Sequence, residues 1–287
     1  MDNSHETQKY SEHKFIGERA MFKTDGADFE YCTFLDGESP LKESKNIVIK
    51  GSTFEWKYPL WYCRNVRVES SMLLINARAG IWYTNDLVMK NMTIEAPKTY
   101  RKCSNMTLEN ISMPNAAETL WNCSNITASA INAKGDYFGM GCQNAEFTDF
   151  SLVGNYPFDG ARNISIKNAN LISKDAFWNC ENITVYNSFI SGEYLAWNSK
   201  NITFINCQIE SLQGLCYIDN LVLKNCRLVN TNLAFEYSTV KADIKSKIDS
   251  IKNPYSGFIA ASGIDDIIFD DPNVDRNKTV ITIQTEN

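Results

Sequence analysis

Histidine is nearly absent from this 287-residue chain, and its two histidines, His5 and His13, both lie in a polar N-terminal stretch. A Ser-His-Asp triad, a histidine general base and zinc binding through histidine ligands are therefore excluded from the interior of the fold. The chain has nine cysteines but no Cys-x-x-Cys pair, so we expect nine thiols rather than a zinc or disulfide framework. The residues point to no metal and no cofactor.

Long hydrophobic runs and an excess of positive charge are also missing. No apolar run reaches the roughly 18 residues that a transmembrane helix needs. The formal charge is −6 at pH 7, whereas nucleic-acid binding needs a basic face. We therefore expect neither a membrane nor a nucleic acid as a partner. The polar start of the chain shows no signal-peptide pattern, which predicts a cytoplasmic protein.

The sequence does contain a repeat. Ten segments that begin with Asn or Asp follow one another at intervals of 19 to 21 residues. Apolar residues occupy the second and fourth positions of a segment, as Ile183 and Val185 do, and this alternation is typical of strands. A fixed period of this length indicates a solenoid. The segments start at Asn46, Asn65, Asp86, Asn105, Asn125, Asn144, Asn163, Asn182, Asn201 and Asn220.

The predicted fold is all-β, a single-domain right-handed parallel β-helix with about 19 residues per coil and roughly 10–12 coils. We expect residues 1–26 to form a polar N-terminal segment and cap. Residues 27–235 should form the regular coils, and residues 236–287 less regular coils and a C-terminal cap. Both ends need caps because an open strand edge pairs readily with another chain.

Asparagine and cysteine recur at fixed positions of the repeat. The chain has 31 asparagines, and one column includes Asn91, Asn110 and Asn206. Stacked asparagines can hydrogen-bond to one another from coil to coil, and they tolerate a left-handed backbone, so we predict a structural role for them. The repeat also explains the many N-x-S/T triplets without glycosylation. The cysteine column, with Cys103 and Cys123 on successive coils, predicts a ladder of buried thiols.

One stripe beside the cysteine column combines tryptophans with charged residues, a composition suited to carbohydrate. Because coils stack about 4.8 Å apart, carboxylates one coil apart can form the acid/base pair of a retaining glycosidase, and carboxylates two coils apart that of an inverting one. The predicted catalytic residues are Glu118, Asp136, Asp175 and Glu193. The predicted ligand-binding residues are Arg78, Lys98, Trp82, Trp121, Tyr156, Trp178 and Trp197. The two cations would hold an anionic part of a sugar or another small polar ligand.

Other interpretations stay open. The tryptophans can belong to the core, with Arg78, Lys98 and Glu118 forming a salt-bridge ladder. The protein would then be a non-enzymatic scaffold that binds another protein along the solenoid surface. Homo-oligomerisation through a flat face stays open as well. The sequence does not decide whether any reaction is catalysed.

Long strings across nearly the whole chain carry a resemblance to a known family. They include DGESPLKESKNI from Asp36, FEWKYPLWY from Phe54, RAGIWYTND from Arg78, SKDAFWNCENITV from Ser173 and GEYLAWNSKNITF from Gly192. With these strings the chain resembles the bacterial proteins grouped as domain of unknown function 3737. The resemblance implies a right-handed β-helix of the pectin-lyase type and no established activity; a hydrolase label would follow from the fold alone. The NTD and GHG motifs of polygalacturonases are missing, so no catalytic residue is carried over.

Overall fold

The computed structural model describes residues 7–284. Residues 1–6 of the predicted N-terminal segment, His5 among them, and residues 285–287 of the predicted C-terminal cap lie outside the described residues. The chain divides into two compact units, Met1–Ala145 (unit 1) and Glu146–Asn287 (unit 2). Each unit is described by itself.

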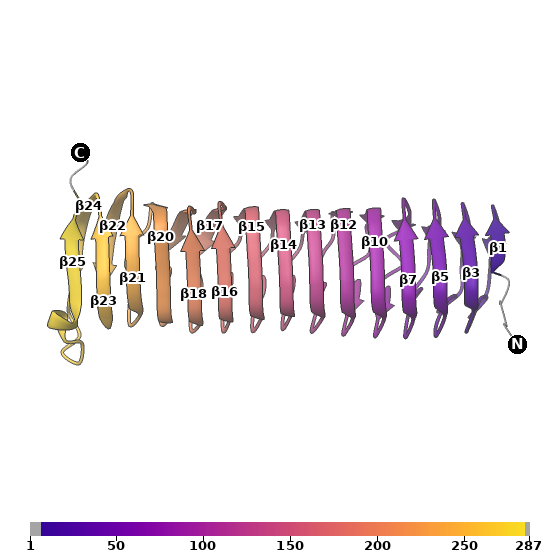
Figure 1. Ribbon diagram of the computed structural model, residues 1–287, viewed down its shortest axis with the longest axis horizontal. Helices are drawn as coiled ribbons and strands as arrows, with labels where there is room; N and C mark the ends of the chain where they lie inside the picture. The colour runs from indigo at the N-terminus through magenta and orange to yellow at the C-terminus, as the bar shows by residue number, and fades with distance from the viewer. Residues whose placement is uncertain (1–6, 285–287) are drawn as a thin grey trace, which may run out of the picture. The chain divides into compact units, whose positions relative to one another are not determined.

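Unit 1 consists of short parallel strands that follow one another coil by coil (Figure 1). They are β1 (Gln8–Ser11), β2 (Lys14–Phe15), β3 (Asp25–Glu30), β4 (Thr33–Phe34), β5 (Lys45–Lys50), β6 (Thr53–Phe54), β7 (Arg64–Glu69), β8 (Met72–Leu73), β9 (Ile81–Trp82), β10 (Asn85–Ile94), β11 (Tyr100–Arg101), β12 (Ser104–Met113) and β13 (Ser124–Lys134). The main ladder pairs β1, β3, β5, β7, β10, β12 and β13 in that order. A second ladder runs through β2, β4, β6 and β8 to β10, and β9 pairs with β11.

Unit 2 repeats this arrangement, and β14 (Gln143–Val153) spans the boundary between the units. Its other elements are β15 (Arg162–Ile172), β16 (Glu181–Tyr186), β17 (Phe189–Glu193), β18 (Lys200–Ile205), β19 (Gln208–Leu212), β20 (Asp219–Val229), β21 (Thr239–Ile244), β22 (Lys247–Lys252), β23 (Ser256–Ala261), β24 (Gly263–Ile268), the 3-10 helix η1 (Arg276–Lys278) and β25 (Thr279–Ile283). The main ladder pairs β15, β16, β18, β20, β21, β23 and β25 in parallel. β17 and β19 form a second ladder, and β22 pairs with β24.

The fold is a parallel β-solenoid of about 15 turns with a spacing of about 19 residues, which confirms the predicted fold class. The turns outnumber the predicted 10–12 because segments near both ends also coil. At the N-terminal end β1 already pairs with β3, and at the C-terminal end β25 pairs with β23. The only helix among residues 7–284 is η1.

The two-residue alternation fills the solenoid interior. Ile183 and Val185 of β16 pair in register with Ile202 and Phe204 of β18, and all four side chains are fully buried. Each such side chain contributes roughly 1.5–3 kcal/mol relative to an exposed one. Because every coil repeats this pattern, the core runs through each unit as stacked columns of identical positions.

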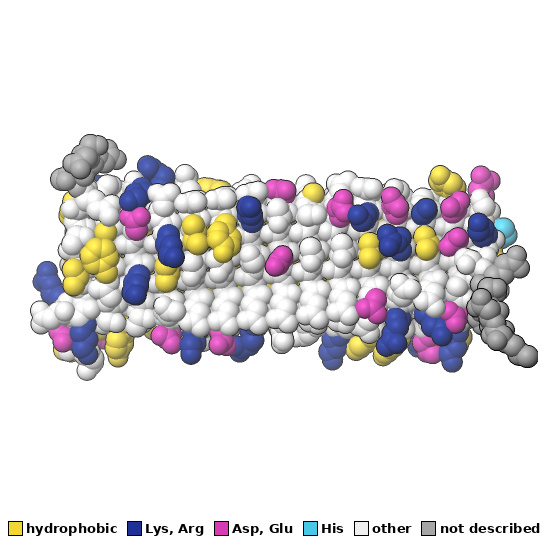
Figure 2. Space-filling view, viewed as in Figure 1, with side chains coloured by type: hydrophobic (Ala, Val, Ile, Leu, Met, Phe, Trp, Pro, Cys, Tyr) yellow, Lys and Arg dark blue, Asp and Glu magenta, His cyan; other side chains and the backbone are white. Residues whose placement is uncertain are grey.

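The asparagine columns form hydrogen-bonded ladders, which confirms their predicted structural role. In the predicted column the Asn110 side-chain amide donates to the Asn91 oxygen at 2.8 Å. In a second column the Asn201 amide donates to the Asn182 oxygen at 2.8 Å. These residues adopt positive φ, 53° at Asn201. The side-chain amide nitrogen that N-glycosylation would modify therefore donates a hydrogen bond within the asparagine ladder. Figure 2 shows uncoloured polar surface between rows of charged side chains on the face drawn.

The cysteine columns are buried thiols, as predicted, since all nine cysteines are unpaired and buried. In unit 1 the backbone N–H of Cys103 lies 3.4 Å from the Cys123 sulfur. Burial raises the pKa of Cys63, Cys142 and Cys180 to about 12. A thiol that is both inaccessible and protonated is a poor nucleophile.

The native protein should therefore resist thiol reagents. We expect none of the nine thiols to react with Ellman's reagent in native buffer, and all nine to react in guanidinium chloride. The measurement is the absorbance of the released thiolate against time. Rapid release of one equivalent from the native protein would show that one column is open to solvent.

Candidate functional site

The tryptophan column lies half-buried at the surface, where each indole fixes a turn of the following coil. Five tryptophans donate the indole N–H to a backbone carbonyl, at distances from 2.6 to 2.9 Å. A half-buried indole N–H usually needs such a partner. Every acceptor residue has a positive φ, so the bond stabilises a left-handed turn. The pairs are Trp61 with Ala79, Trp82 with Lys98, Trp121 with Tyr137, Trp178 with Tyr194 and Trp197 with Gln213.

In unit 1 the indole rings stack along the column. The ring centroids of Trp61 and Trp82 lie 5.0 Å apart at 7° between planes. The next position is Arg101, whose guanidinium carbon lies 4.5 Å from the Trp82 centroid and 4.4 Å from that of Trp121. Both faces of Trp82 are thus covered, and what solvent reaches is the ring edge. Sequence reasoning missed Arg101, although it follows Trp82 by one repeat period of 19 residues.

A groove of about 300 Å³ opens beside this stack. It brings together three of the predicted ligand-binding residues, Arg78, Trp82 and Lys98. Tyr58 packs against Trp61 on its wall, with ring centroids 4.6 Å apart. The groove is lined by Tyr58, Trp61, Arg78, Ala79, Trp82, Pro97 and Lys98. We call it the unit 1 groove.

Cationic groups outnumber carboxylates around the unit 1 groove. Lys98 Nζ lies 3.0 Å from Glu118 Oε2, and Arg101 Nη2 lies 3.5 Å from the same oxygen. Arg78 is exposed and makes no ion pair among residues 7–284. Glu118 thus pairs with two cations, and Arg78 adds a further cation to the groove lining, which contains no carboxylate. A solvent-exposed pair such as Lys98–Glu118 contributes only about 0–1 kcal/mol, so an incoming anion can compete for the lysine.

The predicted line of charged residues divides into two adjacent columns. The Glu118 N–H donates to the Asp136 carbonyl at 2.9 Å, and the Asp175 N–H donates to the Glu193 carbonyl at 2.9 Å. In both pairs the residue that donates its N–H has positive φ. The accepting carbonyl belongs to the residue immediately before the corresponding positive-φ residue of the next coil. Asp136 and Glu193 thus stand one position earlier than Glu118 and Asp175. The stripe is two columns wide rather than a single line.

The remaining predicted aromatic residues lie together in unit 2. The Trp178 and Trp197 rings are nearly parallel, 6.0 Å apart, and the Tyr156 ring stands edge-on to Trp178 at 6.2 Å. Trp121, in contrast, belongs to the stack in unit 1. The predicted binding residues therefore fall into two groups, one in each unit.

The carboxylates of unit 2 differ in their surroundings. Asp175 is buried, and burial raises the pKa of its carboxyl. The negative charge of Glu193 raises this pKa further, while the Tyr156 hydroxyl and the Lys174 charge oppose the shift. Glu193 itself lies 3.1 Å from Lys174.

The raised pKa of Asp175 predicts a pH dependence of stability. Between the ordinary pKa and the raised one, the folded chain holds the proton more tightly than the unfolded chain. The contribution of this residue therefore falls as pH rises through that window. We expect Asp175→Asn, which keeps the left-handed turn, to lose less stability over the same rise in pH. Urea unfolding at a series of pH values measures this, and parallel curves for both proteins would contradict it.

A family model described as a protein of unknown function (DUF3737) matches residues 8–282, nearly the whole chain. The chain belongs to the DUF3737 family. The family resemblance of the sequence is thus confirmed. No curated protein matches this DUF3737 chain. No group of three or more His, Cys, Asp and Glu side chains in the described range is placed to hold a metal ion. No helix formed by these residues is long and apolar enough to cross a membrane.

Solved structures show what the DUF3737 fold resembles. PfbA, a surface adhesin of Streptococcus pneumoniae, aligns with a TM-score of 0.50 and 8% identity over 87% of this chain and 86% of the adhesin. The A-module of the Azotobacter vinelandii mannuronan C-5 epimerase AlgE6 aligns at 0.37 and 10%, over 99% and 92%. An exopolygalacturonase from Thermotoga maritima aligns at 0.33 and 9%, over 96% and 83%. Similarity at such identities shows the fold alone.

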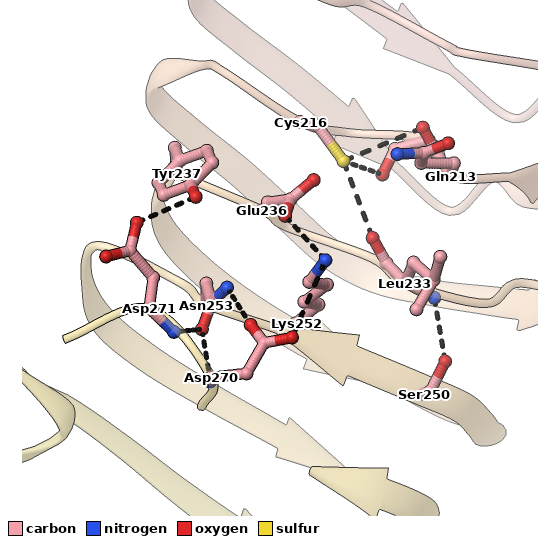
Figure 3. Close-up of polar contacts among 11 residues, drawn as sticks. Gln213, Cys216, Leu233, Glu236, Tyr237, Ser250, Lys252, Asn253, Asp270 and Asp271 are labelled. Carbon is pink, nitrogen blue, oxygen red and sulfur yellow. Dashed lines mark hydrogen bonds and ion pairs between the residues drawn. The ribbon is translucent and has the colours of Figure 1, made fainter. Parts of the chain in front are cut away.

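A second polar cluster surrounds Lys252 in unit 2 of this DUF3737 chain (Figure 3). Lys252 Nζ lies 3.2 Å from Glu236 Oε1 and 3.9 Å from Asp270 Oδ2. The ion pair with Glu236 raises the pKa of Lys252, so the amine stays protonated and is not a base. Sequence reasoning missed Glu236, a buried carboxylate that follows the regular repeats.

The hydrogen bonds of this cluster hold the last coils of unit 2 together. Asn253 donates its amide to Asp270 Oδ1 at 2.7 Å and accepts the Asp270 backbone N–H at 3.1 Å. Tyr237 donates its hydroxyl to Asp271 at 2.8 Å, and this bond raises the Tyr237 pKa to about 12. Burial raises the pKa of the nearby Cys216 thiol to about 12 as well. Because Asn253 and Tyr237 bind Asp270 and Asp271, the cluster holds the turn before η1 (Figure 3).

Proposed function

We propose that this protein binds a saccharide that carries an anionic group, with the unit 1 groove as its binding site. The observation that supports this most is the exposed Arg78, without an acidic partner in the described range, on the wall of a groove that also holds Lys98. A carboxylate, sulfate or phosphate on a sugar would complete the charge balance around Arg78.

The indole edges favour the same ligand class. An aromatic ring is negative on its faces and positive at its edge. The Trp82 faces are covered by Trp61 and Arg101, so the groove presents the positive edge. Stacking of a neutral sugar ring needs an open aromatic face. The unit 1 groove therefore suits an anion at its cations with the sugar C–H groups against Tyr58 and Pro97.

A thermal-shift screen tests this proposal. Wild type and Arg78→Ala are compared with neutral, uronic-acid and phosphorylated mono- and oligosaccharides at low salt. We expect anionic sugars to raise the wild-type melting temperature, and the variant to lose that response while melting at the unliganded wild-type temperature. If no saccharide shifts the wild type, the proposal fails and the protein-binding scaffold becomes the leading alternative.

A second candidate function, acid/base hydrolysis of a glycoside, is favoured by one observation, the raised pKa of Asp175 beside Glu193. In that scheme Asp175 would protonate the leaving oxygen and Glu193 would act as the partner carboxylate. The ion pair between Lys174 and Glu193 counts against it, because the lysine already occupies a carboxylate oxygen of Glu193. The test is the release of reducing sugar from any saccharide found in the screen. Hydrolysis that Asp175→Asn abolishes would support the hydrolase function, and no release would reject it.

A further inference from the structure

One position of the tryptophan column in unit 1 is an arginine. Arg101 of β11 pairs in register with Trp82 of β9, and an isolated parallel bridge pairs it with Trp121 on the next coil. Its guanidinium lies between the two indoles, 4.5 Å from one ring centroid and 4.4 Å from the other. Because Trp82 and Trp121 stand two coils apart, roughly 10 Å, the guanidinium fills a slot between them that is one ring thick.

The two walls of this slot are held independently of the arginine. The Trp82 indole N–H donates to the Lys98 carbonyl at 2.9 Å, and the other face of this indole stacks on Trp61. The Trp121 indole N–H donates to the Tyr137 carbonyl at 2.7 Å. Removal of the arginine side chain should therefore leave an open slot with two aromatic walls.

A tryptophan would fit the same position, because indoles on adjacent coils stack directly elsewhere. Trp61 and Trp82 do so in unit 1, and Trp178 and Trp197 do so in unit 2. The arginine, in contrast, leaves its Nε buried without an acceptor among residues 7–284, which destabilises a fold. Incompletely satisfied polar groups of this kind concentrate at functional sites. What the arginine supplies and a tryptophan does not is positive charge.

This charge bears on the unit 1 groove through Glu118. Arg101 Nη2 and Lys98 Nζ share one oxygen of that carboxylate, at 3.5 and 3.0 Å. Arg101 therefore compensates part of the negative charge that would otherwise act on Lys98 alone. Because Lys98 lines the groove, its charge stays available to an anionic ligand.

We propose that Arg101 determines the specificity of the unit 1 groove for anionic over neutral saccharides, an inference that rests on the proposed function. It closes the slot in which a neutral sugar ring would stack between Trp82 and Trp121, and it keeps Lys98 available to the anionic group. Trp82 is a wall of both the slot and the groove, whereas Arg101 does not line the groove itself. Arg101 is therefore a positioning residue that acts through its neighbours.

Titration of wild type, Arg101→Ala and Arg101→Trp with a uronic-acid disaccharide and its neutral methyl ester tests this role. We expect Arg101→Ala to bind the ester about tenfold more tightly than wild type does, because the slot opens, and the acid several-fold more weakly, because a charge is lost. Arg101→Trp is the matched control, since it fills the slot without charge. It should lose the same affinity for the acid and gain none for the ester.

Ethylguanidinium gives a readout that needs no sugar. An open slot in Arg101→Ala should accept this planar cation between its two indoles. Ethylguanidinium should therefore raise the melting temperature of Arg101→Ala above the value at an equal concentration of ethylammonium, and should not do so for Arg101→Trp. No such rise in Arg101→Ala would mean that the slot closes without the arginine, which would overturn the proposed role. Circular dichroism confirms that both variants fold.

The outcomes separate this role from saccharide binding itself. A wild type that does not prefer the acid rejects the proposed function and, with it, the role of Arg101. A wild type that prefers the acid, together with an Arg101→Ala chain that keeps the same preference, supports the groove as the binding site and overturns only the role of Arg101. An equal gain for the ester in both variants would also overturn it, because Arg101→Trp leaves no open slot.

Discussion

Arg78→Glu should weaken binding of an anionic saccharide by a factor on the order of 100, because the charge facing the ligand changes sign. The new carboxylate would stand in the groove that Lys98 also lines, so it would repel the ligand and attract the lysine away from it. Arg78 is exposed, and stability should change by less than about 0.5 kcal/mol. Isothermal titration with a uronic-acid oligosaccharide measures the loss.

Arg67→Glu is the matched control for this change. Arg67 is exposed on β7 in the same unit, outside the lining of the groove, and the substitution alters the net charge equally. We expect it to change affinity less than about threefold, through long-range charge alone. An equal loss in both variants would mean that the ligand responds to overall charge and not to the unit 1 groove.

Asn201→Val should lower the free energy of unfolding by about 3 kcal/mol. Valine cannot adopt the positive φ of this residue without strain, and the substitution removes two ladder bonds, those with Asn182 and Asn220. The neighbouring ladder amides then lose their partners at a partly buried turn. Urea unfolding followed by circular dichroism measures the change.

Asn201→Asp separates backbone strain from ladder bonding. Aspartate tolerates positive φ and can still accept from Asn220, as Asp86 accepts from Asn105 in unit 1. We expect it to cost no more than about 1.5 kcal/mol. Equal losses for valine and aspartate would show that the ladder bonds, and not the turn conformation, set the cost.

The fold is predictable from the sequence because each coil repeats the same few constraints. The Asn201 column shows this well: one residue type satisfies both the left-handed turn and the hydrogen bond to the next coil. The alternation of Ile183 and Val185 fixes which face is buried. These constraints are local and periodic, so they remain visible without an alignment.

The candidate site was less predictable because its geometry depends on register at single-residue precision. Lys98 and Glu118 stand three residues before their column partners Arg101 and Trp121, whereas Arg78 stands four residues before Trp82. Counting each charged residue back from the tryptophan position would have placed Arg78 in a different column from Lys98 and Glu118. Arg101 was missed because an arginine within a tryptophan column is recognised only once its coil position is known. Covered ring faces cannot be deduced from residue types at all.

If the unit 1 groove recognises an anionic group on a sugar, affinity should depend on that group's charge. The most direct measurement compares one uronic-acid disaccharide with its neutral methyl ester in titrations of the wild-type protein at low salt. The two ligands share their rings and hydroxyls and differ in charge. We predict that the acid binds at least about tenfold more tightly and loses this advantage in Arg78→Glu. Equal affinities for acid and ester would show that the groove does not recognise the anionic group.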